Sequence, residues 1–302
     1  MIVETLASSD KSPNTWLHAC WLSLASFVLT LFCLELIVVS GKISPLWFST
    51  ALMTIVVFRC TSRQLPFLLL ACLIGTAVAN ALIIGPALSN LKFALLNLLQ
   101  ALMGGFLLRA LLNRDAPLVS LNDWIRFVIA TGIISPVIGG TLALWVLHVG
   151  EQASFAFFYT WVISEIIGML ALGPVLLLLS WPLPHDYLKR ASLFETLITL
   201  VLTLTASYLS LRFLPWPFTF ILVVLFWCAV RLPKVEAFVL FFLNASFMAL
   251  LLSLDWIKVT PTVSAYAVIT SWLPFLMVLI PCHIMSLVMD AFRHEKHHIS
   301  ES

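Results

Sequence analysis

Runs of about twenty apolar residues follow one another along almost the whole chain, separated only by short polar, proline or glycine breaks. A hydrocarbon core about 30 Å thick requires about 20 apolar residues per transmembrane helix. Helices satisfy their own backbone hydrogen bonds, which lipid cannot do for them. The 302 residues are 62% hydrophobic and 10% charged, whereas soluble domains are about 25% charged. We therefore predict an all-α, polytopic transmembrane helical bundle without a soluble domain of its own.

The apolar runs predict about ten helices. They cover residues 16–39, 45–58, 65–84, 91–112, 124–147, 155–180, 193–213, 217–230, 236–254 and 270–292. The first run is too long for a signal-peptide core and lacks a small-residue cleavage pattern, so we interpret it as a retained helix. This division predicts a cytoplasmic segment at residues 1–15, an integral membrane domain at 16–292 and a cytoplasmic exit helix at 293–302, leading to an output domain that this chain does not contain.

The basic residues predict the topology. With the N-terminus inside, ten crossings place twelve of the sixteen Lys and Arg on the cytoplasmic side and four outside, as the positive-inside rule requires. If the two short runs, 45–58 and 217–230, were re-entrant loops, the division would be seven inside and nine outside. We therefore prefer ten crossings, with both termini cytoplasmic.

The two short runs resemble each other. Pro45 and Trp47 open the first, and Pro215 and Trp216 open the second; an arginine closes each, and a Leu-Pro pair follows. A parallel repeat relating helices one to three with seven to nine is one interpretation, because paired short segments often mark binding sites. The other is the ordinary enrichment of Trp at membrane interfaces.

Several polar residues fall within the apolar runs. An ionised carboxylate in hydrocarbon is costly, so Glu35 and Glu165 are expected to be protonated, paired or turned toward a polar cavity. The predicted topology places these polar groups in the outer half of the membrane, where they could line a cavity open to the periplasm. For the amides, hydrogen bonding between helices is the alternative, and Trp47 could be an interface anchor. The candidate ligand-binding or signal-sensing residues are Glu35, Trp47, Asn80, Asn97, Gln100, Trp161 and Glu165.

Motifs for catalysis are weak or absent. His294 to His298 match the H-E-x-x-H pattern of zinc proteases, but we interpret this segment as a solvated helix end without a substrate cleft or third ligand. No P-loop, G-x-S-x-G or dinucleotide-binding pattern occurs, and the six cysteines have no metal spacing. We predict no enzymatic activity, no metal and no cofactor in this chain. The net charge of +2 also argues against nucleic acid.

Three stretches carry a resemblance to a known family. Residues 44–48, residues 97–109 and the set Trp161, Glu165, Gly168, Gly173 and Pro174 resemble the membrane-associated sensor domain MASE type 1. The resemblance covers nearly the whole chain and is greatest to the N-terminal membrane region of enterobacterial multidomain diguanylate cyclases, in which PAS, GGDEF and EAL domains follow. The family often has Asp where this chain has Glu165 and a Pro where it has Phe48. No Gly-Gly-Asp-Glu-Phe motif occurs here, so cyclase activity does not carry over.

The resemblance implies a sensory module of the bacterial inner membrane that senses a periplasmic or membrane-borne signal and regulates a cytoplasmic output, which we expect to be cyclic di-GMP synthesis by a diguanylate cyclase. Pro274, Pro281 and Arg293 are the predicted signal-transmission residues, since prolines can kink the last helix. Expected partners are membrane lipid, an unknown small ligand or membrane protein, and a second copy in a homodimer. The alternatives are a small-molecule transporter and a membrane scaffold with a surface of small residues such as Gly104, Gly105, Gly139 and Gly140.

Overall fold

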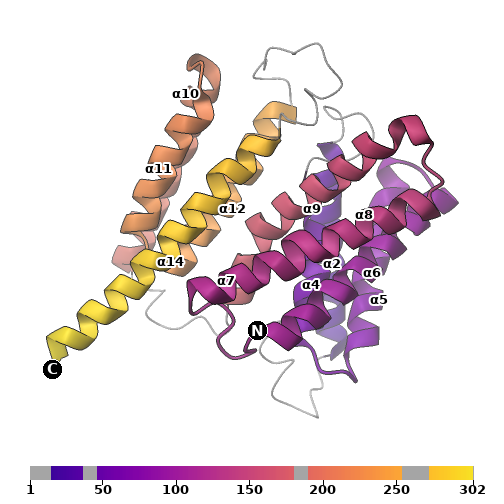
Figure 1. Ribbon diagram of the computed structural model, residues 1–302, viewed down its shortest axis with the longest axis horizontal. Helices are drawn as coiled ribbons and strands as arrows, with labels where there is room; N and C mark the ends of the chain where they lie inside the picture. The colour runs from indigo at the N-terminus through magenta and orange to yellow at the C-terminus, as the bar shows by residue number, and fades with distance from the viewer. Residues whose placement is uncertain (1–14, 37–45, 180–189, 254–271, 302) are drawn as a thin grey trace. The chain divides into compact units, whose positions relative to one another are not determined.

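The structure is a computed structural model that describes residues 15–36, 46–179, 190–253 and 272–301. In these ranges all regular secondary structure is helical, which confirms the all-α prediction. The described ranges form ten helices, the fifth containing a π-helical segment (Figure 1). They are α2 (Thr15–Glu35), α4 (Phe48–Arg59), α5 (Leu65–Ile83), α6 (Leu88–Leu111), α7–η1–α8 (Leu121–Phe127, Val128–Ile134, Ser135–Val146), α9 (Glu151–Leu178), α10 (Arg190–Phe213), α11 (Pro217–Arg231), α12 (Lys234–Ser253) and α14 (Leu273–Glu301).

Eight of these helices are long and apolar enough to cross a membrane, so the chain is a multi-pass membrane protein. The two exceptions are α4 and α11, with 12 and 15 residues. At a rise of 1.5 Å per residue they are about 18 and 22 Å long, shorter than a hydrocarbon core of about 30 Å. The ten crossings and the cytoplasmic termini therefore stay predictions.

The ends of two helices bear on the predicted domain limits. The first helix ends at Glu35, and the remainder of its predicted run, together with Pro45, lies outside the described residues. The last helix continues past residue 292 to Glu301, so the predicted exit segment is helical as far as the structure describes it. Pro281 lies inside this helix, which neighbouring transmembrane helices commonly accommodate.

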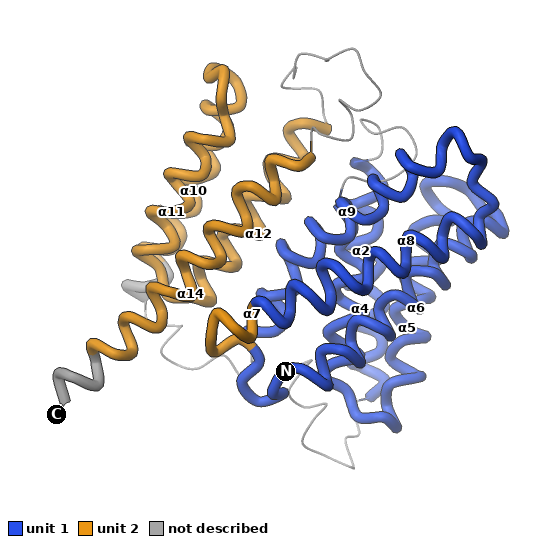
Figure 2. Tube along the Cα trace, in the orientation of Figure 1, with its two compact units in different colours: residues 1–117, 125–182 blue, residues 118–124, 183–302 orange. Residues whose placement is uncertain are grey.

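The chain divides into two compact units (Figure 2). Unit 1 comprises residues 1–117 and 125–182, and unit 2 comprises residues 118–124 and 183–302. In unit 1 the short helix α4 contacts α2, α5, α6 and α9. Eleven of its twelve residues are buried, so it forms the centre of this unit.

The same pairs of helices are in contact in the two units. In unit 1, α2 contacts α4 and α5, while α6 contacts α4 and α5; in unit 2, α10 contacts α11 and α12, while α14 contacts α11 and α12. An arginine of each fourth helix also donates to the carbonyl that follows the short helix: Arg109 to Cys60 O, and Arg293 to Leu232 O. These matches favour the internal-repeat interpretation and extend it to a fourth helix.

The long helix α7–η1–α8 changes its hydrogen-bond register near its middle. The backbone N–H of Ser135 donates to the carbonyl of Ala130, five residues earlier, over the π-helical segment Val128–Ile134. Pro136 follows in the first turn of α8. A proline has no N–H and its ring clashes with the carbonyl four residues before it. A wider π turn relieves this clash at the carbonyl of Gly132, whereas in an α turn the ring would kink the helix.

Candidate functional site

The central polar group of unit 1 is the carboxyl of Glu165, on α9. Its side chain is only 3% exposed. Thr50 Oγ1, from the buried face of α4, donates a hydrogen bond of 3.0 Å to Glu165 Oε1. The contact joins residues 115 positions apart in the sequence, and the backbone N–H of Trp47 also donates to Ser164 O. These two hydrogen bonds therefore hold the beginning of α4 against α9 at the buried carboxyl of Glu165.

Gln100 of α6 joins two further helices to this carboxyl. Its Oε1 accepts a hydrogen bond of 3.0 Å from Trp161 Nε1 of α9, and its backbone carbonyl accepts one of 2.9 Å from Ser135 Oγ of α8. The Gln100 side chain is also close enough to Glu165 to interact with its carboxyl. Trp161 is stacked with Phe93 and Phe157, at centroid distances of 6.0 and 5.9 Å, which fixes the direction of its N–H. We call Thr50, Gln100, Trp161 and Glu165 the Glu165 cluster.

Two glycines let the helices approach closely enough to form the Glu165 cluster. A Cβ atom at Gly139 would lie 2.0 Å from Gln100 Oε1, and one at Gly168 would lie 2.1 Å from the backbone oxygen of Trp47. Real Cβ atoms do not come so near to another heavy atom, so at Gly168, where the obstacle is backbone, only glycine fits. At Gly139 a larger residue would displace the Gln100 side chain from its place in the cluster. Such close approach through small residues is a common basis of helix packing in membranes.

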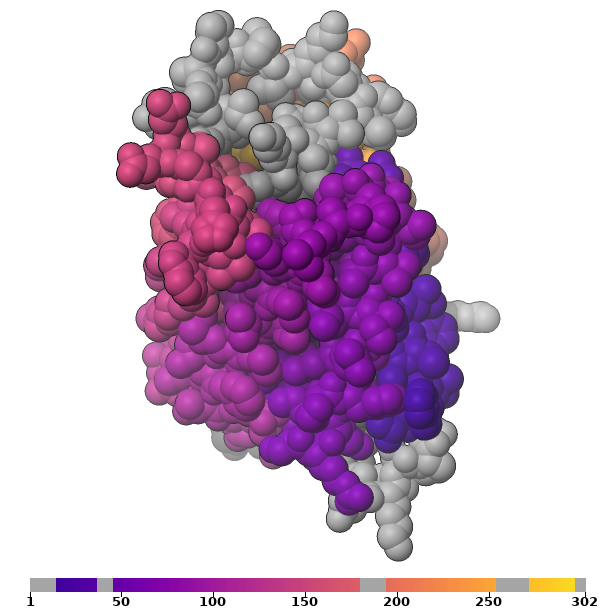
Figure 3. All heavy atoms as spheres, turned by 90° about the vertical axis from the view of Figure 1, so that its right-hand side faces the viewer, coloured from indigo at the N-terminus to yellow at the C-terminus, as the bar shows by residue number. Residues whose placement is uncertain are grey.

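Four polar atoms around the Glu165 cluster are buried without a hydrogen-bond partner among the described residues. They are Glu165 Oε2, Gln100 Nε2, Thr54 Oγ1 and Trp47 Nε1. An unpaired buried polar atom costs about 1–3 kcal/mol, so a proton, a water molecule or a small polar ligand that paired with these atoms would recover part of this free energy. Side chains of unit 1 pack closely over the face seen in Figure 3, and each member of the cluster is at most 4% exposed.

The other candidate residues lie apart from the Glu165 cluster or at its edge. Asn97 is buried on α6, three residues before Gln100. Asn80 donates to the carbonyl of Thr76 in its own helix, α5. Glu35 is exposed at the last residue of α2. Of the seven predicted residues, the structure brings Gln100, Trp161 and Glu165 together, with Trp47 beside them.

Sequence reasoning missed the hydroxyl groups of unit 1. Thr50 and Ser135 supply hydrogen bonds to Glu165 and Gln100. A second network joins α2, α4 and α5, with Ser49 Oγ and Ser26 Oγ at 2.8 and 2.9 Å from Thr76 Oγ1. No local pattern distinguishes these hydroxyls from the many that bond to their own helix, as Thr131 does to Phe127 O.

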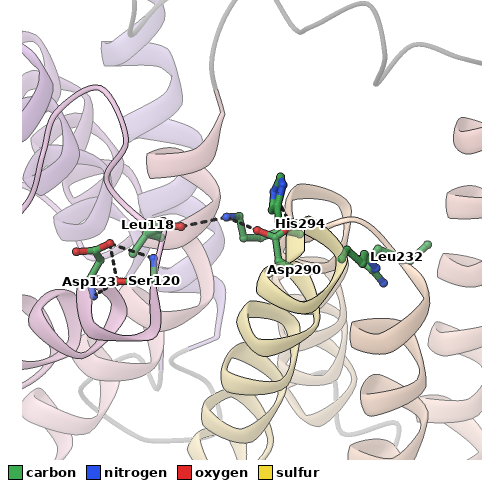
Figure 4. A network of polar contacts seen from close by, with 8 residues as sticks. Leu118, Ser120, Asp123, Leu232, Asp290 and His294 are labelled. Atoms are coloured by element: carbon green, nitrogen blue, oxygen red, sulfur yellow. Dashed lines mark hydrogen bonds and ion pairs between the residues drawn. The ribbon is translucent and has the colours of Figure 1, made fainter. Parts of the chain in front are cut away.

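The predicted transmission residues lie on α14 in unit 2. Arg293 donates to the carbonyls of Leu232 and Val230 at the end of α11. One turn away, Asp290 pairs with Lys234 at 2.6 Å, and Lys234 also donates to Leu118 O (Figure 4). Pro274 lies in the first turn of α14 and Pro281 in its interior. The whole of α14, which we call the exit helix from here on, is thus held to α11 and α12 by charged side chains near its end.

The H-E-x-x-H segment does not form a metal site among the residues whose side chains the structure describes. His294 is 76% exposed and lies 3.9 Å from Asp290, while the side chains of His297 and His298 lie outside the described residues. Across the described part of the chain, no three His, Cys, Asp or Glu residues lie close enough together to hold a metal ion.

The chain matches a family of membrane domains along nearly its whole length. The family model MASE1 matches residues 16–297, a range that overlaps all ten helices described above. The chain belongs to the MASE1 family. The match confirms the family resemblance carried by Trp161, Glu165, Gly168, Gly173 and Pro174. MASE1 is a membrane sensor domain and not a catalytic domain.

This MASE1 domain is 42% identical over 294 residues to the probable diguanylate cyclase DgcE of Escherichia coli strain K12. The aligned region is 96% of this chain but 26% of DgcE, so the chain spans about a quarter of that relative. No solved structure matches this chain. The family and the helices show a membrane sensory input domain.

Proposed function

We propose that the Glu165 cluster is the sensing site of this MASE1 domain and that its state controls cyclic di-GMP synthesis by a cytoplasmic cyclase region. The observation that carries the proposal is the half-satisfied carboxyl of Glu165. Thr50 donates to one oxygen and the Gln100 side chain also interacts with the carboxyl, but the second oxygen makes no hydrogen bond of normal geometry among the described residues. Intramembrane acids seldom serve packing alone and commonly mark functional sites.

The chemistry of the cluster favours a proton or a small hydrogen-bond donor as the signal. A carboxylate only accepts hydrogen bonds, whereas a protonated carboxyl also donates one. Protonation would therefore change the partners of Glu165 Oε2, and an amine or hydroxyl of a ligand would act on the same atom. Because Thr50, Gln100 and Trp161 come from three helices, α4, α6 and α9, any such change alters contacts between helices.

The proposed output rests on the relative and on the exit helix. DgcE bears the name of a probable diguanylate cyclase and is about four times as long as the matched region. The last helix of this chain continues to Glu301, well past the predicted end of its membrane span. We place the domain in the bacterial inner membrane with both termini cytoplasmic. A homodimer that pairs two exit helices fits this proposal, because paired helices can pass on a rotation or a shift.

The test is a chimera in which this chain replaces the matching quarter of DgcE, with cellular cyclic di-GMP as the readout. Glu165→Gln keeps the shape of the side chain but removes its charge and its titration. We expect this change to alter cyclic di-GMP by about fivefold or more, the lower end of ordinary coupling between sites. Glu151→Gln, at the exposed first residue of the same helix, is the control. Equal output from the wild type and both variants, at equal expression, would contradict the proposal.

Small-molecule transport is a second candidate, favoured by the repeated helix arrangement of the two units. The proton is the natural probe because the buried group is a carboxyl. A pH-sensitive dye in proteoliposomes, under an imposed membrane potential, would report proton entry. If the domain is only a sensor, protons should enter no faster than into empty vesicles. Proton entry that Glu165→Gln abolishes would establish transport instead.

A further inference from the structure

A buried histidine on the exit helix is hydrogen-bonded to a buried tryptophan from a distant part of the chain. Trp124 Nε1 donates to His283 Nδ1 at 3.3 Å, across a sequence separation of 159 residues. Their side chains are 5% and 0% exposed. Both residues belong to unit 2. Neither was a candidate from the sequence.

The surroundings of His283 make this hydrogen bond specific. The rings of Phe238 and Phe241, from α12, lie 4.6 and 5.8 Å from the imidazole centroid. Because Nδ1 accepts from Trp124, the neutral imidazole carries its proton on Nε2, which has no partner among the described residues. The hydrogen bond from Trp124 therefore fixes the orientation of the His283 ring, which also lies against two apolar rings.

Trp124 also lies in the first turn of a helix that contacts the Glu165 cluster further along its length. The helix α7–η1–α8 begins in unit 2 and continues in unit 1 from Ile125. In unit 1, Ser135 Oγ donates to the carbonyl of Gln100, and Gly139 packs against the Gln100 side chain. One continuous helix thus carries contacts to both the cluster and the exit helix.

The π-helical segment gives this helix a means of having two states. A π turn holds one more residue than an α turn, and such segments are frequent at functional sites. If Val128–Ile134 changed to α-helical register, the two flanks would rotate relative to each other by one residue, about 100°. A discrete element of this kind is what coupling between distant sites requires.

We infer that α7–η1–α8 transmits the state of the Glu165 cluster to the exit helix, with the π-helical segment as its switching element and Trp124–His283 as its coupling pair. The inference rests on the proposed function and assigns the route that its signal takes. Trp124 and His283 are positioning residues, because they act through α14 and do not touch the signal. The route begins at Gln100 and ends two residues after Pro281.

A double-mutant cycle in the DgcE chimera tests the coupling pair. Trp124→Phe keeps an aromatic ring but removes the donor. We expect the change in cyclic di-GMP caused by Glu165→Gln, about fivefold, to fall below about twofold in the Trp124→Phe background. Trp145 is an exposed tryptophan of the same helix. In the Trp145→Phe background, the change in cyclic di-GMP caused by Glu165→Gln should be as large as in the wild type. An undiminished effect in both backgrounds would overturn this route while leaving the proposed function intact.

Two variants of His283 separate coupling from folding. His283→Asn retains an acceptor near the position of Nδ1 and should preserve the effect of Glu165→Gln, whereas His283→Leu should abolish it. Equal behaviour of the two at matched expression would contradict a role for the hydrogen bond. If Glu165→Gln changes nothing even in the wild-type background, the sensing site itself is wrong and the route has no signal to carry.

Deletion of one residue tests the switching element. Removing Ile129 takes the extra residue out of the π-helical segment, so both flanks keep their registers in a continuous α-helix that accommodates Pro136 by a kink. We expect folded protein whose cyclic di-GMP output no longer responds to Glu165→Gln. Deleting Leu142, in the α-helical part of the same helix, should instead rotate its flanks and reduce the yield of folded protein. An Ile129 deletion that folds and still responds would overturn the assignment of the π-helical segment.

Discussion

The two units share one arrangement of four helices but pack it by different means. All eleven glycines of the chain fall within the residues of unit 1, and unit 2 has none. In unit 1 the short helix α4 buries eleven of its twelve residues. In unit 2 its counterpart α11 buries four of fifteen, and Val223 and Trp227 are exposed. The same arrangement therefore surrounds a polar centre in unit 1 and leaves an apolar face on α11 in unit 2.

The polar side chains also show what the two units share and where they differ. In each unit the first helix bonds to the second and third: Ser26 to Ser49 and Thr76 in unit 1, Thr203 to Cys228 and Ser207 to Asn244 in unit 2. Only unit 1 adds α9 to the short helix, and with it the carboxyl of Glu165. The carboxyl that we propose as the sensing group thus comes from α9, which lies outside the repeated helices, while the last helix belongs to unit 2.

The largest loss of stability is expected from a substitution at a closely packed glycine of unit 1. Gly168→Val places side-chain atoms against the backbone of Trp47, which cannot rotate away. Overpacking commonly costs about 1–3 kcal/mol, and we expect about 3 kcal/mol or more here because the obstacle is backbone. Thermal unfolding in detergent measures it. Gly150→Ala, where a Cβ atom meets nothing within 4 Å, should melt as the wild type does, and tolerance of both changes would break the packing comparison.

A smaller loss of stability is expected when the hydrogen bond from Thr50 on α4 to Glu165 on α9 is removed. Thr50→Val keeps the shape of the side chain but leaves Glu165 Oε1 without its donor. The expected loss is about 1–3 kcal/mol of unfolding free energy, again read from thermal unfolding. The matched change Thr205→Val, at an exposed residue of α10 that bonds only to its own helix, should have no measurable effect. Equal losses would show that Thr50 is an ordinary helix hydroxyl.

The shared arginine contact predicts similar effects in the two units. Arg109→Met and Arg293→Met each remove a charged donor from the carbonyl after a short helix. Each should lower the unfolding free energy by about 1–2 kcal/mol, since both arginines are partly exposed. Hydrogen exchange should rise at the end of α4 in the first variant and of α11 in the second. An effect in only one of them would count against the repeat.

The smallest effect is expected at the pair between Arg231 and Glu195. The two side chains are 60% and 46% exposed at a distance of 2.6 Å. Exposed ion pairs contribute about 0–1 kcal/mol, so Glu195→Gln should leave thermal unfolding within about 0.5 kcal/mol of the wild type. A larger loss would mean that this end of unit 2 is more closely packed than its exposure indicates.

The helices and the central acid could be predicted from the sequence because lipid makes both conspicuous. Long apolar runs give the helices, and the cost of a carboxyl in hydrocarbon singles out Glu165. Glu35 met the same criterion but lies exposed at the end of α2. A run of residues does not show where a helix ends within it, which decides whether an acid is buried or at the surface.

The partners of Glu165 could not be predicted, because they are set by contacts between helices. Thr50 lies 115 residues from Glu165, and Trp124 lies 159 residues from His283. A hydroxyl in a transmembrane helix can bond to its own backbone at little cost, so its residue type does not reveal a partner in another helix. The π-helical segment before Pro136 was not predicted either, because a hydrogen-bond register within a continuous apolar run leaves no signature in the sequence.

Hydrogen exchange of the exit helix tests the central claim most directly, because it needs neither the signal nor an output domain. The chain in lipid nanodiscs would be compared as wild type, Glu165→Gln and the control Glu151→Gln, following backbone amides between His283 and Arg293. Our account predicts that Glu165→Gln alters exchange on α14 as well as on α9, while the control matches the wild type. A change confined to α9, with α14 exchanging as in the wild type, would contradict the claim that this buried carboxyl governs the exit helix.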